Sequence, residues 1–200
     1  MSAESAVGLI KVAHLDAADL DAASVVLIRS FATSPDSVSV SLKDVGDFLK
    51  GFLSPDNEGA FFTARLTPSD ANVLPEGRTY LIVGTAAVSL DGGALDTEAV
   101  RLPAGAAVIA NMAVNQTHRG LGIARLLLQA CEQHALALGL DCVGLAVHKN
   151  NAPAQELYLS SGYTKLQDAK PIGLPALLNF GLPGSKHIAM VKRLGGGSHQ

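Results

Sequence analysis

The chain has 200 residues, of which 48% are hydrophobic and 16% are charged, and its formal net charge is −3. This composition excludes an intrinsically disordered chain and is typical of one globular domain with a sizeable core. The slightly negative charge argues against a dedicated nucleic-acid-binding protein and suits a neutral or cationic substrate better. No apolar run is long enough to predict a membrane span. We expect a single domain over residues 1–194 and a flexible tail over residues 195–200.

The N-terminal sequence MSAESAVGLI has neither a basic segment nor a long apolar segment, so it predicts no secretory signal peptide. It is also too acidic and too short for a transit peptide. We therefore expect a cytoplasmic protein, with the plastid stroma as the alternative if a transit peptide was removed before this numbering begins. The two cysteines, Cys131 and Cys142, lie in apolar stretches and are expected to be buried thiols. Their spacing supports neither a disulfide nor a metal site, and no bound metal is expected.

Hydrophobic periodicity and turn residues divide the chain into eleven expected elements. In chain order they are a strand at 8–15, helices at 16–32 and 41–53, strands at 58–66, 78–90 and 105–114, a helix at 123–138, a strand at 141–151, a helix at 152–161, and strands at 163–167 and 186–194. The strand at 105–114 is apolar nearly throughout, which predicts helices on both faces of the sheet. The helix at 123–138 has the clearest apolar stripe, and Gly139 is well placed to end it. This order predicts an α/β (α+β) fold.

The turn before that helix reads Arg119-Gly120-Leu121-Gly122-Ile123-Ala124. A glycine-rich turn between a buried strand and a helix directs backbone N–H groups and the helix dipole toward an anion, typically a phosphate. A P-loop is excluded because no Lys-Ser/Thr pair follows Gly122. A dinucleotide fingerprint is disfavoured because Arg125 stands where a small residue is needed, and because Asp141 precedes the next strand. Taken alone, the turn could also be an ordinary start of a helix.

Two sequence patterns together are more specific than this turn. Residues 119–124 have the form R-x-x-G-x-A, and a later segment has the form N-x-x-A-x-x-L-Y-x-x-x-G-Y, formed by Asn151, Ala154, Leu157, Tyr158, Gly162 and Tyr163. With a helix and a strand between them, the two patterns resemble the acetyl-CoA-binding core of the GNAT superfamily of N-acetyltransferases, closest to protein N-acetyltransferases of the plastid and bacterial type. The resemblance is specific over about residues 106–166. It implies a GNAT fold with a mixed central sheet of six to seven strands flanked by about four helices.

The resemblance implies acetyl-CoA as co-substrate. The turn at 119–124 would hold the diphosphate, the backbone at 112–114 would pair with the pantetheine and polarise the thioester, and Asn151 would bond pantetheine amides. A helix N-cap is a second role for Asn151, and the two are compatible. The implied cofactor-binding residues are Met112, Ala113, Val114, Arg119, Gly120, Leu121, Gly122, Ile123, Ala124, Arg125, Asn151, Ala154 and Tyr158.

Two catalytic residues are predicted. Tyr158 matches the family tyrosine that protonates the CoA thiolate, although a tyrosine on an apolar helix face can also be plain core. The usual base is the Glu or His of an L-[EH]-V strand segment, and this chain has Ala146 there. His148 faces the same side by strand alternation and is predicted as the base. His187 on the last strand is a second candidate, and a water chain or a plain surface role for His148 are the alternatives.

The implied reaction is direct attack of a primary amine on acetyl-CoA in a ternary complex. The preferred acceptor is a protein N-terminus or lysine, bound by a monomer or homodimer with no nucleic-acid or membrane partner. The alternatives are a small amine (an arylalkylamine, a polyamine or an antibiotic) and, in another class, a CoA-binding sensor that has lost catalysis. Segments 31–42 and 170–186 are expected to shape the acceptor site. Acidic side chains that could attract a cationic amine are Asp36, Asp44, Asp47, Asp56 and Glu58.

Overall fold

The computed structural model describes residues 1–5, 7–31, 41–90, 105–166 and 187–195. The segments expected to shape the acceptor site, 31–42 and 170–186, lie almost wholly outside the described residues, as do Asp36 and most of the predicted tail. None of the helices in the described part of the chain is both long and apolar enough to span a membrane.

A mixed β-sheet flanked by four helices forms the described part of the chain. Its elements are β1 (Ser2–Ser5), β2 (Gly8–His14), α1 (Leu20–Phe31), α2 (Leu42–Gly51), β3 (Ala60–Pro68), β4 (Leu81–Ser89), β5 (Ala107–Val114), α3 (Ile123–Ala137), β6 (Cys142–His148), α4 (Ala152–Ser160), β7 (Thr164–Lys165) and β8 (His187–Arg193). Short 3₁₀ turns occupy Ala17–Asp19, Ala71–Val73 and Gln116–His118. The strand order is β1-β2-β3-β4-β5-β6-β8-β7, in which β5 and β6 are parallel and the other neighbouring pairs are antiparallel.

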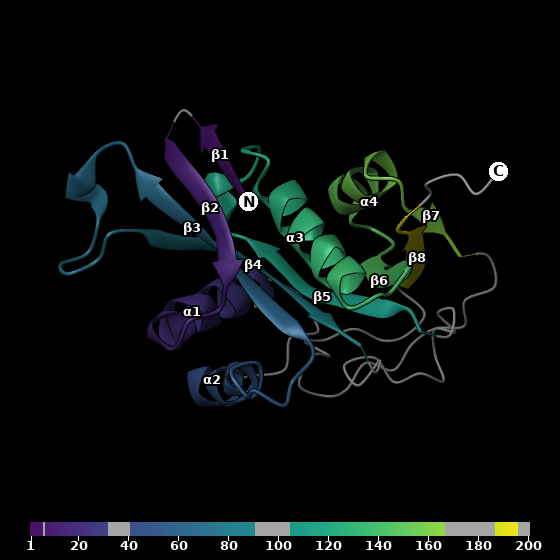
Figure 1. Ribbon diagram of the computed structural model, residues 1–200. Helices are drawn as coiled ribbons and strands as arrows, with labels where there is room; N and C mark the ends of the chain where they lie inside the picture. The colour runs from purple at the N-terminus through teal and green to yellow at the C-terminus, as the bar shows by residue number, and fades with distance from the viewer. Residues whose placement is uncertain (6, 32–40, 91–104, 167–186, 196–200) are drawn as a thin grey trace.

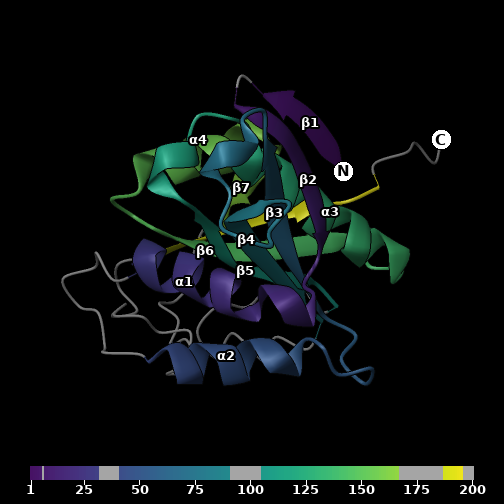
Figure 2. The ribbon, with the colours of Figure 1, turned by 90° about the vertical axis from the view of Figure 1, so that its left-hand side faces the viewer.

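Helices cover both faces of this sheet, as the apolar strands predict. Helices α1 and α2 lie on one face, and α3 and α4 on the other (Figure 1, Figure 2). The adjacent residues Phe61 and Phe62 of β3 show why, because successive side chains of a strand point to opposite faces. Phe61 packs in the core beneath α1 and α2, and Phe62 in the core beneath α3. Burying each ring contributes about 1.5–3 kcal/mol to folding.

The sheet has eight described strands, whereas the sequence predicts six to seven. The additional strand is β1, whose sequence SAES has no apolar alternation. It forms by backbone pairing with β2, with Ala3 opposite Ile10 and Glu4 opposite Leu9. An edge strand held by main-chain hydrogen bonds needs no buried face of its own, so periodicity does not reveal it.

A buried carboxylate ties the start of α1 to the sheet. Asp19 is completely buried and accepts hydrogen bonds from Arg65 Nε at 3.0 Å and from the Tyr80 hydroxyl at 3.0 Å. Arg65 Nη2 is also 2.7 Å from Asp19 Oδ2, and the Arg65 guanidinium lies over the Tyr80 ring at 4.9 Å. Burial, followed by the adjacent Asp19 carboxylate, raises the pKa of Tyr80. The sequence predicts only an acidic helix start here, because long-range partners leave no local pattern.

Candidate active site

Strands β5 and β6 separate along their length. They pair through Ala107–Val143, Val108–Gly144 and Ile109–Leu145, and no further. Beyond these pairs β5 stays bonded to β4, while residues 146–148 of β6 stay bonded to β8. We call residues 110–114 of β5 and 146–148 of β6 the β5–β6 fork. Backbone groups that face across the fork have no partner strand there, so a ligand can pair with them.

A β-bulge at Asn111 bends β5 at the base of the fork. The register with β4 shifts between Thr85 and Ala87, and Asn111 has a φ of 52°. Asparagine is one of the few residues that tolerate this left-handed conformation. The Thr85 hydroxyl donates to the Asn111 carbonyl at 3.0 Å and fixes the bulge. The extra residue turns β5 away from β6, and the Asn111 Nδ2 group is buried without a hydrogen-bond partner.

Helix α3 begins beside the carboxyl end of β5 with its first amide groups free. Its N-cap is Gly122, with a φ of 76° and no side-chain cap. Among the described residues, no acceptor bonds the amide N–H groups of residues 120–124. A Cβ added at Gly122 would meet nothing within 4 Å. Free amides at the positive end of a helix dipole suit a bound diphosphate, so this part of the predicted cofactor site fits the group.

The close approach of α3 to β4 places this helix start next to the fork. A Cβ on Gly84 would lie 3.1 Å from Ile123 Cγ2 and 3.1 Å from Leu127 Cδ1, so only glycine leaves room for the observed contact. Arg119 Nε donates to the Val114 carbonyl at 3.3 Å, which ties the turn to the end of β5. The predicted backbone contacts at Met112, Ala113 and Val114 therefore lie directly before the predicted diphosphate turn.

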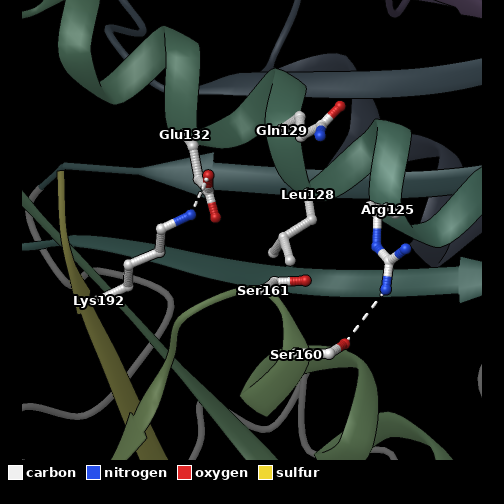
Figure 3. Close-up of a pocket in the computed structure, with 7 residues that line it drawn as sticks. All are labelled: Arg125, Leu128, Gln129, Glu132, Ser160, Ser161 and Lys192. Atoms are coloured by element: carbon white, nitrogen blue, oxygen red, sulfur yellow. Dashed lines mark hydrogen bonds and ion pairs between the residues drawn. The ribbon is translucent and has the colours of Figure 1, made fainter.

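Arg125 points away from that turn and toward α4. Its Nη2 donates to Ser160 Oγ at 3.2 Å across a polar hollow between α3, α4 and β8 (Figure 3). On the opposite side of the hollow, Lys192 Nζ lies 2.7 Å from Glu132 Oε2. The hollow is lined by Arg125, Leu128, Gln129, Glu132, Ser160, Ser161 and Lys192. Of the two predicted arginines, Arg119 is thus tied to the turn, and Arg125 to the neighbouring helix.

Helix α4 carries the second sequence pattern. The Asn151 side chain accepts from the Ala154 amide at 3.2 Å, which confirms the N-cap role. Tyr158 is 6% exposed, packs against Tyr163 at 5.8 Å, and its hydroxyl has no hydrogen-bond partner among the described residues. Burial, with a smaller effect of Cys131, raises the pKa of Tyr158 to about 12. The hydroxyl therefore keeps its proton at neutral pH, as a proton donor must.

The two candidate bases face each other across β6 and β8. His148 is paired with His187, and their ring centroids are 5.4 Å apart at an interplanar angle of 85°. His148 Nδ1 accepts from the Asn150 amide at 3.1 Å. Within the described part of the chain, His187 Nε2 is buried without a hydrogen-bond partner. Burial, followed by the charge of His148, lowers the pKa of His187. Sequence alternation could place each histidine on a face, but it could not predict that they meet.

The next residues, one histidine and the two cysteines, have structural roles. His134 bonds the Glu58 carbonyl at 2.9 Å and packs with His14 and Phe62, so it lies at the core edge. Cys131 and Cys142 are buried free thiols, as predicted. Among the described residues there is no cluster of three or more His, Cys, Asp or Glu side chains suited to a metal ion.

Two of the acidic side chains expected to attract a cationic amine instead interact with residues in or next to α2. Asp44 completes a capping box with Ser41, and Asp47 lies 3.3 Å from Lys43 and 2.8 Å from Lys50. A solvated, locally paired helix surface therefore accounts for these two charges.

Comparison with known proteins identifies the family. Residues 39–163 match the model of the acetyltransferase (GNAT) family. The chain belongs to this family and is an acetyl-CoA-dependent acetyltransferase, which confirms the family predicted from the two patterns. No curated protein sequence matches the chain.

Solved structures share the fold at low sequence identity. A Salmonella typhimurium protein described as an acetyltransferase and solved with its cofactor acetyl-CoA is 16% identical, with a TM-score of 0.64 over 94% of this chain and 96% of that chain. A ribosomal-protein-alanine N-acetyltransferase from Brucella melitensis is 17% identical, with a TM-score of 0.63 over 92% and 99%. A chain of the NatC complex bound to Gag peptide and CoA is 19% identical, with a TM-score of 0.59 over 93% and 99%. These likenesses confirm the predicted fold class.

Proposed function

We propose that this chain transfers the acetyl group of acetyl-CoA to a protein amine, either an N-terminal α-amine or a lysine, by direct attack in a ternary complex. One observation carries the proposal: the β5–β6 fork opens beside the free amide groups at the start of α3. An acetyl donor whose pantetheine arm is joined to a diphosphate needs both features, a backbone edge for the pantetheine and an anion site beside one end of that edge.

Different residues of this chain bind different parts of acetyl-CoA. The amides of residues 120–124 bind the diphosphate, and Arg119 adds positive charge beside them. The backbone of Met112 and the Val114 amide hold the pantetheine along the fork, where Asn151 offers its remaining amide N–H groups. When bound, acetyl-CoA supplies a thioester whose carbonyl is the electrophile. Holding an amine against this carbonyl removes much of the entropic barrier, several kcal/mol by the usual order of magnitude.

Tyr158 supplies a proton to the leaving group. As the new C–N bond forms and the C–S bond breaks, the sulfur gains negative charge, and the Tyr158 hydroxyl donates its proton there. The raised pKa of about 12 keeps that proton on Tyr158 until the thiolate develops. A positioned acid of this kind accelerates a reaction by about 10²–10⁴-fold.

A protein amine is favoured over a small amine by the sequence pattern and by the shared fold. The NMAV segment at 111–114 and the second pattern at 151–163 resemble the protein N-acetyltransferases most closely. Among the structural neighbours, one acts on a ribosomal-protein alanine and another was solved with a peptide bound. The net charge of −3 also suits a cationic amine.

An acceptor panel tests the proposal. The chain is incubated with acetyl-CoA and three groups of amines: peptides with free N-termini, N-terminally blocked peptides that contain lysine, and small amines such as spermidine and tyramine. Mass spectrometry then identifies products that carry one added acetyl group. We expect acetylated peptides, with Tyr158→Phe as the low-activity control. Acetylation of the small amines alone would replace the proposed acceptor class, and tight acetyl-CoA binding without any product would favour the sensor hypothesis.

A further inference from the structure

We propose that His187 accepts the proton of the acceptor amine and that His148 acts as its positioning residue. This inference rests on the proposed acetyl transfer to an amine. It concerns the step for which the sequence offers no standard residue, since the usual carboxylate or histidine position is Ala146.

The hydrogen bond from Asn150 decides the tautomer of His148. A backbone N–H can only donate, so His148 Nδ1 must use its lone pair to accept this bond at 3.1 Å. The neutral ring then carries its proton on Nε2 and has no lone pair left. Taking up a second proton would break the bond and set two N–H groups against each other. The turn itself is fixed, because the Asn151 amide bonds the His148 carbonyl at 2.9 Å.

His187 has the free nitrogen that His148 lacks. Its Nε2 is buried and has no hydrogen-bond partner among the described residues. Leaving such a group unpaired in a folded protein is unfavourable, so it usually reflects a ligand or a catalytic role. Burial also keeps the ring neutral near pH 7, because it lowers the pKa of His187.

The position of His187 compensates for the alanine at the usual base position. Ala146 is paired with Ala189, so His187 is the diagonal neighbour of Ala146 on the same face of the sheet. Diagonal neighbours are about 7–8 Å apart, within reach of a long side chain. The side chains of the two alanines end at Cβ, so neither carries a group that could act as the base there.

The other titratable groups nearby are few. Cys142 and Arg193 belong to this face but lie at the opposite end of the two strands, where they pair with each other. Tyr158 packs in the core on the other face, beneath α3. Within the described strands, His148 is thus the titratable residue next to His187 on this face.

The proton balance is complete with these groups. His187 Nε2 takes one proton from the ammonium form of the acceptor, whose nitrogen then attacks the thioester carbon. Tyr158 protonates the leaving sulfur as the C–S bond breaks. The attacking nitrogen loses its second proton to solvent, solvent returns a proton to Tyr158, and His187 releases its proton to solvent after the product leaves. His148 keeps His187 oriented by ring contact, and a positive charge on His148 would oppose protonation of His187.

The kinetic test compares three matched variants on the peptide acetylated best in the acceptor panel. His187→Gln should lower kcat/KM about 10²-fold at pH 7, the usual scale for a positioned base, and the deficit should shrink as pH rises and the amine loses its proton unaided. Added imidazole should partly restore His187→Gly. His148→Gln should move the acid limb of the profile to higher pH, because the repulsion from His148 that lowers the pKa of His187 is then absent. His134→Gln is the control and should leave kcat/KM within twofold. Unchanged thermal unfolding and acetyl-CoA affinity would show that each variant is folded.

The inference is overturned if His187→Gln keeps more than half of kcat/KM at pH 7 while the intact chain is active. An inactive intact chain would instead refute the proposed function, and nitrogen-15 NMR then tests the inference separately. In the intact protein, we expect neutral His148 to carry its proton on Nε2 and His187 to titrate below 6.5, the ordinary histidine pKa. A proton on His148 Nδ1, or a His187 that titrates above its ordinary value, would overturn it.

Discussion

Strands β3 and β4 pair over seven residue pairs, from Ala60–Val88 to Leu66–Leu81, whereas β5 and β6 part after three residue pairs. Both pairs belong to one sheet, and both are covered by helices. In the first pair, backbone groups of the two strands bond to each other and stabilise the fold. The hydrogen bonds that Asp19 accepts from Arg65 and Tyr80 also tie the start of α1 to these strands. The second leaves backbone and side-chain groups without protein partners, at Asn111, at the start of α3 and at His187. Stability and chemistry are therefore concentrated in different halves of the sheet, and substitutions can separate the two.

The largest expected effect is on stability, in the β3–β4 half. Asp19→Ala removes a buried carboxylate and leaves Arg65 and Tyr80 without their partner, which should lower the free energy of unfolding by about 3–5 kcal/mol. Chemical denaturation followed by circular dichroism measures the change. The matched control is Asp47→Ala, an aspartate that is half exposed and also has two lysine partners, for which we expect less than about 1 kcal/mol. Equal losses for the two variants would contradict the structural role of Asp19.

The next effect is on catalysis, beside the fork. Tyr158→Phe keeps the packed ring but removes the proton donor, so kcat should fall by roughly 10²-fold or more while acetyl-CoA affinity is kept. Steady-state kinetics and calorimetry give the two quantities. Tyr163→Phe is the control, because its buried ring lies 5.8 Å from that of Tyr158 but its hydroxyl has no role in the proposed mechanism. If kcat for Tyr158→Phe stays within twofold of the parent with chemistry rate-limiting, Tyr158 is not the acid.

A smaller change is expected at the ends of α3. Gly122 and Gly139 have φ values of 76° and 78°, and a Cβ on either would meet nothing within 4 Å. Alanine at either position should cost about 1–2 kcal/mol of stability because of the left-handed backbone. Only Gly122→Ala should weaken acetyl-CoA binding, by about tenfold or more, since its methyl group occupies the space before the free amides. Equal calorimetric affinities for the two variants would remove the turn from the cofactor site.

The smallest expected effect is a dependence of stability on pH. Burial lowers the pKa of His14, with a contribution from His134, and burial also lowers the pKa of His118. A histidine whose pKa is lower in the folded than in the unfolded state binds fewer protons when folded, so stability is lost as pH falls below about 6.5. The urea midpoint should therefore decrease from pH 7 to pH 5.5, and less so in His14→Gln. An identical decrease in His14→Gln would assign the effect to other groups.

The sequence predicts the local features of both halves well and their long-range features poorly. The apolar stripe of α3 predicts its start at Ile123, which the structure confirms, whereas the cofactor turn and the acid role of Tyr158 stay predictions from the two spaced patterns. The bulge at Asn111 and the contact between His148 and His187 depend on strand register, which no local pattern contains. The buried network of Asp19 and the strand β1 were missed for a related reason. The partners of Asp19 lie far along the chain, and β1 is held by backbone pairing alone. Two aspartates expected to attract a cationic amine, Asp44 and Asp47, instead bond to residues in or next to α2.

Amide hydrogen exchange with and without saturating acetyl-CoA tests the central claim most directly, because it compares the two halves in one experiment. The account predicts added protection in residues 110–125 and 146–151, and little change in β3 and β4, whose amides are already paired. Protection confined to other segments, or no change despite measured binding, would contradict the assignment of the β5–β6 fork as the acetyl-CoA site.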